Sequence, residues 1–153
     1  MKILMVCLGN ICRSPLADGL LQHKVSDFHL DVEVDSAGTS GYHTGEAPDR
    51  RMILTAANRG TPIDHLRARK FVKEDLDRFD LIYVMDKNNL QDVLELAENK
   101  EQRSKVKMIL EETFPGEQKE VPDPYFGGLD GFEQVYDLLD AATDKIIENL
   151  KQL

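Results

Sequence analysis

Short apolar runs alternate along the chain with longer segments of helical periodicity. Residues 2–8 and 80–85 are compact apolar runs, a pattern typical of strands that are buried on both faces. Towards the end of the chain, apolar side chains recur every three or four residues over 132–150, which predicts a long amphipathic helix. The same patterns predict further strands at 32–36 and 105–110, and further helices at 14–25, 49–58 and 88–97.

Strands that alternate with helices favour right-handed crossover connections, and these build a parallel sheet with helices on both faces. Ligands of such α/β folds bind beyond the carboxyl ends of the strands, where loops lead into helices. The loop after the first expected strand is therefore the first place to look for chemistry.

The composition indicates one acidic domain that spans residues 1–153. With 19 basic and 28 acidic residues the formal net charge is −9, which argues against a nucleic-acid binder. No apolar run approaches the length of a membrane-spanning helix, and the run at 3–8 is too short for a signal peptide. We therefore expect a cytoplasmic protein without a membrane partner. Only 2 cysteines are present, Cys7 and Cys12, too few for a disulfide scaffold or a four-cysteine zinc site.

The loop at residues 7–14 combines features that bind a tetrahedral dianion. Gly9 has the freedom to adopt a positive φ and Asn10 tolerates the left-handed region, so successive N–H groups can turn inward as a concave nest. Ser14–Pro15 predicts the start of a helix, with the serine as N-cap, and the positive end of that helix points at the same spot. Arg13 adds a fork of donors that grips two phosphate oxygens.

Cys7 stands at the end of the first expected strand and faces this nest. An arginine and a helix N-terminus beside a thiol favour the thiolate at neutral pH, and Ser14 can donate a hydrogen bond to the sulfur. A thiolate beneath a bound phosphate can attack phosphorus and form a covalent phosphocysteine. The alternative is that Cys7 and Cys12 are two small buried hydrophobic residues.

Splitting a phosphate ester also requires a proton for the leaving oxygen. Asp123 lies between two prolines in the segment 121–126, and prolines fix φ and stiffen the loop that would hold this acid. The alternative is an ordinary turn aspartate. The neighbouring Tyr125 and Phe126 either cover the core or flank a planar substrate beside the phosphate site.

These segments together resemble the low molecular weight protein tyrosine phosphatases. The N-terminal signature reads Val-Cys-Leu-Gly-Asn-Ile-Cys-Arg-Ser-Pro at residues 6–15, and the acid motif reads Asp-Pro-Tyr at 123–125. The likeness includes residues 35–39 and 63–65 and extends over the whole chain. It implies a three-layer α/β sandwich, in which a four-stranded parallel sheet lies between helices on both faces. It also implies hydrolysis through phosphocysteine without a metal or cofactor.

The resemblance implies a role for each residue that matches the family's motifs. Cys7 is expected to be the nucleophile, Arg13 the phosphate clamp, and Asp123 the general acid and then the base for the water that releases phosphate. Cys12 is expected to trap Cys7 in a reversible disulfide that protects it from overoxidation. Without the family, His65 reads as an ordinary surface or core histidine. The phosphate-binding loop comprises Leu8, Gly9, Asn10, Ile11, Cys12, Arg13 and Ser14, the supporting network Asn10, Ser14, Ser36 and His65, and the aromatic walls Tyr42, Tyr125 and Phe126.

Other activities are alternatives within and beside this family. Its phosphoarginine phosphatases resemble one another in a threonine where this chain has Ile11, and its arsenate reductases use further cysteines, which this chain lacks after Cys12. A non-hydrolytic phosphocarrier that accepts phosphate on cysteine would need neither Arg13 nor Asp123. We therefore expect a phosphotyrosine-containing protein as the substrate, with a bacterial tyrosine kinase as a candidate, and a monomer with at most weak self-association.

Overall fold

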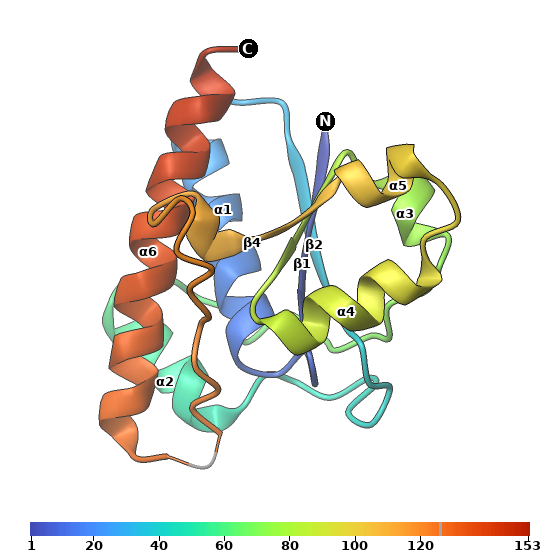
Figure 1. The fold of residues 1–153 in the computed structure, drawn as a ribbon. Coiled ribbons are helices and arrows are strands. Elements are labelled where there is room, and N and C mark those ends of the chain that lie inside the picture. The colour runs from blue at the N-terminus through green and yellow to red at the C-terminus, as the bar shows by residue number, and fades with distance from the viewer. Residues whose placement is uncertain (126) are drawn as a thin grey trace.

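Four parallel strands form one sheet within residues 1–125 and 127–153, which the computed structural model describes (Figure 1). The strands are β1 (Lys2–Cys7), β2 (Glu33–Gly38), β3 (Leu81–Val84) and β4 (Val106–Met108). Their spatial order is β2-β1-β3-β4, and every neighbouring pair is parallel. The expected α/β sheet is confirmed, with β1 at its centre.

Helices cover both faces of this sheet and so complete a three-layer sandwich (Figure 1). One layer consists of α1 (Arg13–Asp27), α2 (Arg50–Asn58) and α6 (Leu129–Lys151). The opposite layer consists of α3 (Asp75–Arg78), α4 (Lys87–Leu96) and α5 (Lys100–Ser104). The two layers agree with the expectation of helices on both faces.

The side chains of β1 alternate between two apolar cores, one on each side of the sheet. Ile3 and Met5 pack in the core beneath α1, α2 and α6. Leu4 and Val6 pack in the core on the side of α3 and α4. Because successive side chains of a strand point to opposite faces, a strand covered on both faces must be apolar on both, as β1 is from Ile3 to Cys7. Burying each of these side chains stabilises the fold by about 1.5–3 kcal/mol.

The chain order places a ligand crevice at the carboxyl end of β1. From β1 the chain first reaches β2 on one side, and it later fills β3 and β4 on the other side. The crossovers on the two sides leave the loop after β1 uncovered at this switch of direction, which is where α/β folds bind ligands. At the same edge, Cys7 at the end of β1 lies opposite Gly38 at the end of β2.

The start of α1 differs from the expected helix start. The helix begins at Arg13, its N-cap position is Cys12, and Ser14 lies inside the first turn rather than capping it. The serine hydroxyl makes a hydrogen bond with the Cys7 sulfur instead. This contact outweighs the local preference of serine for the N-cap position. In the loop before the helix, Asn10 has the positive φ of 57°, whereas Gly9 is not among the positive-φ residues.

The later elements are shorter than their apolar patterns predict. The expected strand at 105–110 is limited to β4, because residues Ile109–Glu111 turn into a 3-10 helix. The short helices α3 and α5 were not predicted, since each spans no more than about one turn and leaves no readable periodicity. The remaining helices and strands lie within a few residues of their expected ranges.

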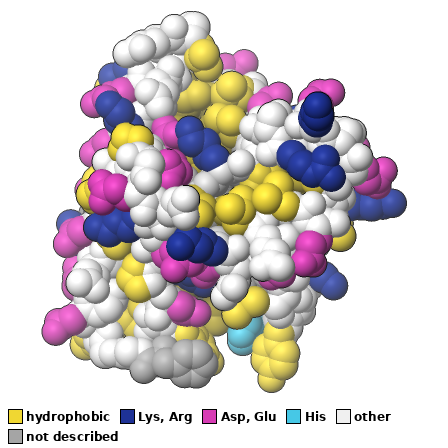
Figure 2. All heavy atoms as spheres, viewed as in Figure 1, with side chains coloured by type: hydrophobic (Ala, Val, Ile, Leu, Met, Phe, Trp, Pro, Cys, Tyr) yellow, Lys and Arg dark blue, Asp and Glu magenta, His cyan; other side chains and the backbone are white. Residues whose placement is uncertain are grey.

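The face seen in Figure 2 shows apolar side chains gathered along the middle of the molecule, with charged side chains on both flanks. A groove beside the edge strand β4 is lined by apolar Leu90, Val106 and Met108 together with Lys87 and Lys107. Among the helices of the described residues, none combines the length and the apolar character needed to cross a bilayer.

Asp18 is a buried carboxylate on α1, the helix that follows the loop after β1. Gln22 donates a hydrogen bond of 2.6 Å to its Oδ1 atom. Burial raises the pKa of Asp18 to about 6, although hydrogen bonds from Gln22 and Ser36 act in the opposite direction. The folded protein therefore holds this proton more tightly than the unfolded chain does, and ionising Asp18 costs stability.

The stabilisation from protonated Asp18 is complete below about pH 4 and is lost as the pH rises through about 6. We therefore expect Asp18→Asn to raise the free energy of unfolding near neutral pH by roughly 3 kcal/mol, and to change it little at about pH 4. Urea unfolding of the variant and the parent at several pH values measures this difference. Asp31→Asn, at an exposed carboxylate, is the matched control and should show no such pH-dependent gain. An equal effect of Asp18→Asn at both pH values would contradict this assignment.

Candidate active site

A pocket of about 240 Å³ opens at the carboxyl end of β1. It brings the loop after β1 together with Asp123 and Tyr125, more than a hundred residues later in the chain. Its lining therefore contains the thiol, the guanidinium and the carboxylate that the sequence singled out. The lining residues are Cys7, Leu8, Gly9, Ile11, Cys12, Arg13, Tyr42, His43, Asp123 and Tyr125.

Asn10 holds the loop in its curled conformation through every polar group of its side chain. Its Nδ2 atom donates to the hydroxyl of Ser14 at 2.7 Å and to that of Ser36 at 3.0 Å. Its Oδ1 atom accepts from the main-chain N–H of Arg69 at 3.0 Å. These bonds stabilise the left-handed φ of this buried residue and turn its main-chain N–H toward the sulfur of Cys7, 3.3 Å away.

The sulfur of Cys7 makes two hydrogen bonds, although the residue is only 3% exposed. One comes from the main-chain N–H of Asn10, and the other joins the Sγ atom to the Ser14 hydroxyl at 3.0 Å. Because the Ser14 oxygen already accepts from Asn10, its own proton is free to point at the sulfur. The Asn10 N–H and the Ser14 hydroxyl therefore both contact the sulfur from the loop that surrounds it.

Arg13 is buried beside the pocket and is held rigidly by groups far away in the sequence. Its Nη1 atom donates to the Asp86 carboxylate at 2.7 Å and to the Val121 carbonyl at 3.1 Å. Burial lowers the pKa of Arg13, but the negative charges of Cys7 and Asp86 raise it by more, so its pKa lies above the ordinary value. The guanidinium is therefore a permanent, preorganised cation beside the thiol.

Asp86 is a functional residue that the sequence analysis did not identify. It caps the N-terminus of α4, where its Oδ1 atom accepts from the Asn89 N–H at 2.8 Å. Its second oxygen is the one that binds Arg13. An aspartate before a predicted helix reads as an ordinary N-cap, and only the fold shows that it also orients the arginine.

Asp123 reaches the pocket from the loop between the two prolines. Its Oδ2 atom lies 3.7 Å from Nη2 of Arg13, and its Oδ1 atom accepts from the Tyr125 N–H at 3.0 Å. Arg51 of α2 supports this loop, because its guanidinium donates to the Tyr125 carbonyl at 2.8 Å and lies over the tyrosine ring. Nothing in the sequence pattern marks Arg51 for this role.

Aromatic side chains stand at the rim of the pocket. Tyr42 is 85% exposed, and Tyr125, from the loop that carries Asp123, lines the same pocket. His43, which was not predicted, lines the pocket next to Tyr42 and makes a 2.9 Å contact with Glu46. The position of Phe126 lies outside the described residues.

The structure does not bring His65 into the network behind the loop. This side chain is exposed in the short turn at 63–66, whose anchor is the fully buried Ile63, and among the described residues it makes no hydrogen bond. The bond to the Asn10 oxygen that a network partner would supply comes from the main chain of Arg69. Sequence alone favours a side-chain donor, because a main-chain donor leaves no signature in residue identity.

Cys12 is buried in the same loop and lines the same pocket as Cys7, and both cysteines are in the free thiol form. Burial is the main cause that raises the pKa of the Cys12 thiol well above its ordinary value, and the charge of Asp49 adds to it. Cys12 is therefore a protonated thiol at neutral pH. The Cys7 sulfur, by contrast, has the Asn10 N–H and the Ser14 hydroxyl beside it. Within the described residues, no group of three or more His, Cys, Asp or Glu side chains is placed to hold a metal ion.

Known proteins of similar sequence match this chain over nearly its whole length. A relative from Synechocystis sp. is 45% identical over 152 residues, which cover 98% of this chain and 96% of its own. The low molecular weight protein-tyrosine-phosphatase of Streptomyces coelicolor is 36% identical over 155 residues, covering 99% and 94% of the two chains.

A solved structure shows the same likeness in three dimensions. The crystal structure of a protein tyrosine phosphatase from Entamoeba histolytica superposes with a TM-score of 0.92 at 37% identity, covering 99% of this chain and 97% of that one. The family model described as low molecular weight phosphotyrosine protein phosphatase matches residues 2–153. This chain therefore belongs to the low molecular weight phosphotyrosine protein phosphatases.

Proposed function

We propose that this phosphatase hydrolyses phosphotyrosine in proteins, and small aryl phosphates, through a covalent phosphocysteine on Cys7. The observation that carries the proposal is the convergence of three groups on one pocket. The Cys7 sulfur, the Arg13 guanidinium and the Asp123 carboxylate all line it. Leu8, Gly9, Ile11 and Cys12 complete the wall around the phosphate, with Asn10 and Ser14 behind it.

In the first step the Cys7 thiolate attacks phosphorus, an S–P bond forms and the P–O bond to the aryl oxygen breaks. Protonated Asp123 gives its proton to that oxygen, so the leaving group departs as a neutral phenol. Arg13 binds two of the phosphoryl oxygens and stabilises the charge that they carry in the transition state. Its bond to Asp86 keeps the guanidinium in place during this step.

In the second step a water molecule attacks the phosphocysteine from the side that the phenol has left. The Asp123 carboxylate takes a proton from this water, the S–P bond breaks, and inorganic phosphate and the Cys7 thiolate are released. The Asp123 side chain is 40% exposed, which gives water access to it. Two donors on the departing sulfur, from Asn10 and Ser14, make Cys7 a good leaving group.

The pocket favours an aromatic ester. Tyr42 and Tyr125 contribute aromatic rings to its lining, and Ile11 contributes a branched apolar side chain. A guanidinium substrate would be less well matched to Ile11 than an aryl ring is. Arsenate reduction would require further cysteines, and the sequence has none beyond Cys7 and Cys12.

We further propose that residues 1–153 act as a single monomeric domain in the cytoplasm. A free thiol pair in the active site suits a compartment that keeps thiols reduced. The substrate is a phosphotyrosine-containing protein, with a bacterial tyrosine kinase as the candidate. The net charge of −9 makes a nucleic-acid partner unfavourable.

Cys7→Ser should abolish turnover of p-nitrophenyl phosphate while phosphate or vanadate still binds. A serine hydroxyl retains the shape of the loop, but it is a much weaker nucleophile and a poorer leaving group than a thiolate. Steady-state assays measure turnover, and isothermal titration measures anion binding. Normal activity in this variant would refute the nucleophile assignment. A single burst of phenol without turnover in the parent enzyme would instead support the phosphocarrier.

Asp123→Asn should lower kcat/KM, which reports the first step alone, by about 10²–10⁴-fold for esters of poorly acidic phenols, because these leaving groups need the proton. The loss should shrink for strongly acidic phenols such as p-nitrophenol, since they leave without help. A series of aryl phosphates that spans leaving-group acidity measures the slope of log kcat/KM for parent and variant. Asp130→Asn, at an exposed carboxylate in the first turn of α6, is the control. The same loss for every leaving group would move the acid role elsewhere.

Cys12 is proposed to protect Cys7 from irreversible oxidation. Peroxide oxidises the Cys7 thiolate to a sulfenic acid, and the Cys12 thiol then displaces water from it to form a disulfide. Activity lost to hydrogen peroxide should return with dithiothreitol in the parent enzyme. In Cys12→Ser, a larger fraction should stay inactive after the same exposure, with sulfinic acid at Cys7 detected by mass spectrometry. Equal recovery in the two proteins would show that Cys12 has no protective role.

A further inference from the structure

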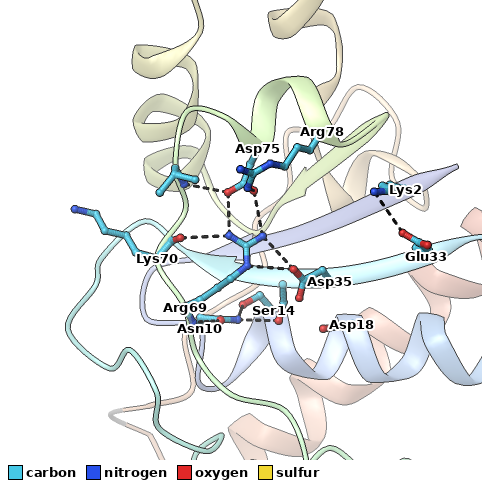
Figure 3. A network of polar contacts seen from close by, with 12 residues as sticks. Lys2, Asn10, Ser14, Asp18, Glu33, Asp35, Arg69, Lys70, Asp75 and Arg78 are labelled. Atoms are coloured by element: carbon cyan, nitrogen blue, oxygen red, sulfur yellow. Dashed lines mark hydrogen bonds and ion pairs between the residues drawn. The ribbon is translucent and has the colours of Figure 1, made fainter.

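Outside the pocket, a second charged cluster ties α3 to the edge strand β2 (Figure 3). Asp75 in α3 is fully buried, and its carboxylate accepts from Nη1 and Nη2 of Arg69 at 3.0 and 3.2 Å. The Nε atom of the same arginine donates to Asp35 of β2 at 3.1 Å. The Arg69 guanidinium is thus held by two carboxylates from two different elements. Neither Asp75 nor Asp35 lines the substrate pocket.

The main chain at Arg69 is fixed as firmly as its side chain. Its carbonyl accepts from the Gly38 N–H at 2.8 Å, and the Phe71 N–H donates to the Gly38 carbonyl at 2.7 Å. This segment therefore runs along the end of β2 as a short parallel bridge. In this position the Arg69 N–H points at the Oδ1 atom of Asn10, 3.0 Å away (Figure 3).

This N–H determines which way the Asn10 amide faces. In the observed orientation, the amide nitrogen donates to Ser14 and Ser36 while the oxygen accepts from Arg69. If the Asn10 amide were turned over, its nitrogen would face the Arg69 N–H, and two donors would oppose each other. The amide oxygen would then face Ser14.

The orientation matters because Ser14 has a single proton. While Asn10 donates to the Ser14 oxygen, that proton is available to the Cys7 sulfur at 3.0 Å. If the amide oxygen faced Ser14, it would accept the same proton, and the sulfur would lose a donor. Whether the Cys7 sulfur receives the Ser14 proton thus depends on the main-chain N–H of Arg69, which lies outside the pocket.

We propose that Arg69 is a positioning residue, whose guanidinium, held by Asp75 and Asp35, keeps its own N–H on Asn10 and so directs the Ser14 proton to Cys7. This inference rests on the proposed role of Cys7 as the nucleophile. Arginine suits the task because its planar fork binds two carboxylates at fixed angles, which a lysine ammonium does not do. Removing the fork leaves the buried Asp75 with weaker compensation, from the Val72 N–H and the more distant Arg78, and lets the segment that carries the N–H move.

The first test compares Arg69→Met with Arg78→Met. Arg78 lies 3.8 Å from the same Asp75 carboxylate but is largely exposed and makes no contact with Asn10, so it is the matched control. The rate of alkylation of Cys7 by iodoacetate, followed by mass spectrometry over a range of pH, reports the thiolate directly. We expect Arg69→Met to slow alkylation near neutral pH about tenfold and to shift its pH profile upward, and Arg78→Met to leave both unchanged.

A double-mutant cycle with Ser14→Ala separates positioning from general destabilisation. If Arg69 acts through the Ser14 proton, Arg69→Met should change the alkylation rate less than about twofold once Ser14 has been replaced. The same factor in both backgrounds would overturn the proposal. So would an unchanged alkylation profile accompanied only by a lower melting temperature.

Arg69→Lys keeps a positive charge beside Asp75 and serves if Arg69→Met does not fold. It should slow alkylation in the same direction as Arg69→Met, because it lacks the fork, and an alkylation profile identical to the parent's would again overturn the proposal. Alkylation does not require turnover. Activity in Cys7→Ser would therefore refute the proposed function, whereas normal alkylation in the Arg69 variants would refute this inference alone.

Discussion

The site depends on the side-chain amide of Asn10, in which every polar atom is hydrogen-bonded. Asn10 uses both amide protons and its oxygen to bind Ser14, Ser36 and the Arg69 main chain, and this set of bonds holds it in a left-handed conformation. That conformation turns the Asn10 N–H toward the sulfur of Cys7. Because a non-glycine residue in this region is strained, the loop needs such compensation to persist. The anion-binding curvature is thus a property of the network behind the loop as much as of the loop itself.

A buried guanidinium is the second constraint, and it explains why distant segments meet here. Arg13 is nearly inaccessible to solvent, and a buried cation requires charged and polar partners. Asp86 supplies one charge from the start of α4, and the Val121 carbonyl supplies an acceptor from the loop that carries Asp123. The same bonds that offset its burial bring the carboxylate of the proposed acid to the rim of the phosphate site.

Much of this could be predicted from local patterns. The apolar run of β1 and the periodicity of α6 identified a strand buried on both faces and an amphipathic helix, since both patterns follow from side-chain direction along a regular backbone. The start of α1 and the φ of Gly9 were predicted less well. At those positions Ser14 and Asn10 satisfy tertiary partners, and the local preferences for capping and for glycine are overridden.

The sequence by itself determined which chemical groups are available and the order of strands and helices. Cys7, Arg13 and Asp123 were recognisable because their immediate neighbours, a strand, a helix start and two prolines, are local features. Only the tertiary structure decided that Asp86 binds Arg13, that the Arg69 main chain binds Asn10, and that His65 is exposed. Hydrogen bonds between segments tens of residues apart depend on how the layers pack, and a main-chain donor such as the Arg69 N–H carries no trace of its role in residue identity.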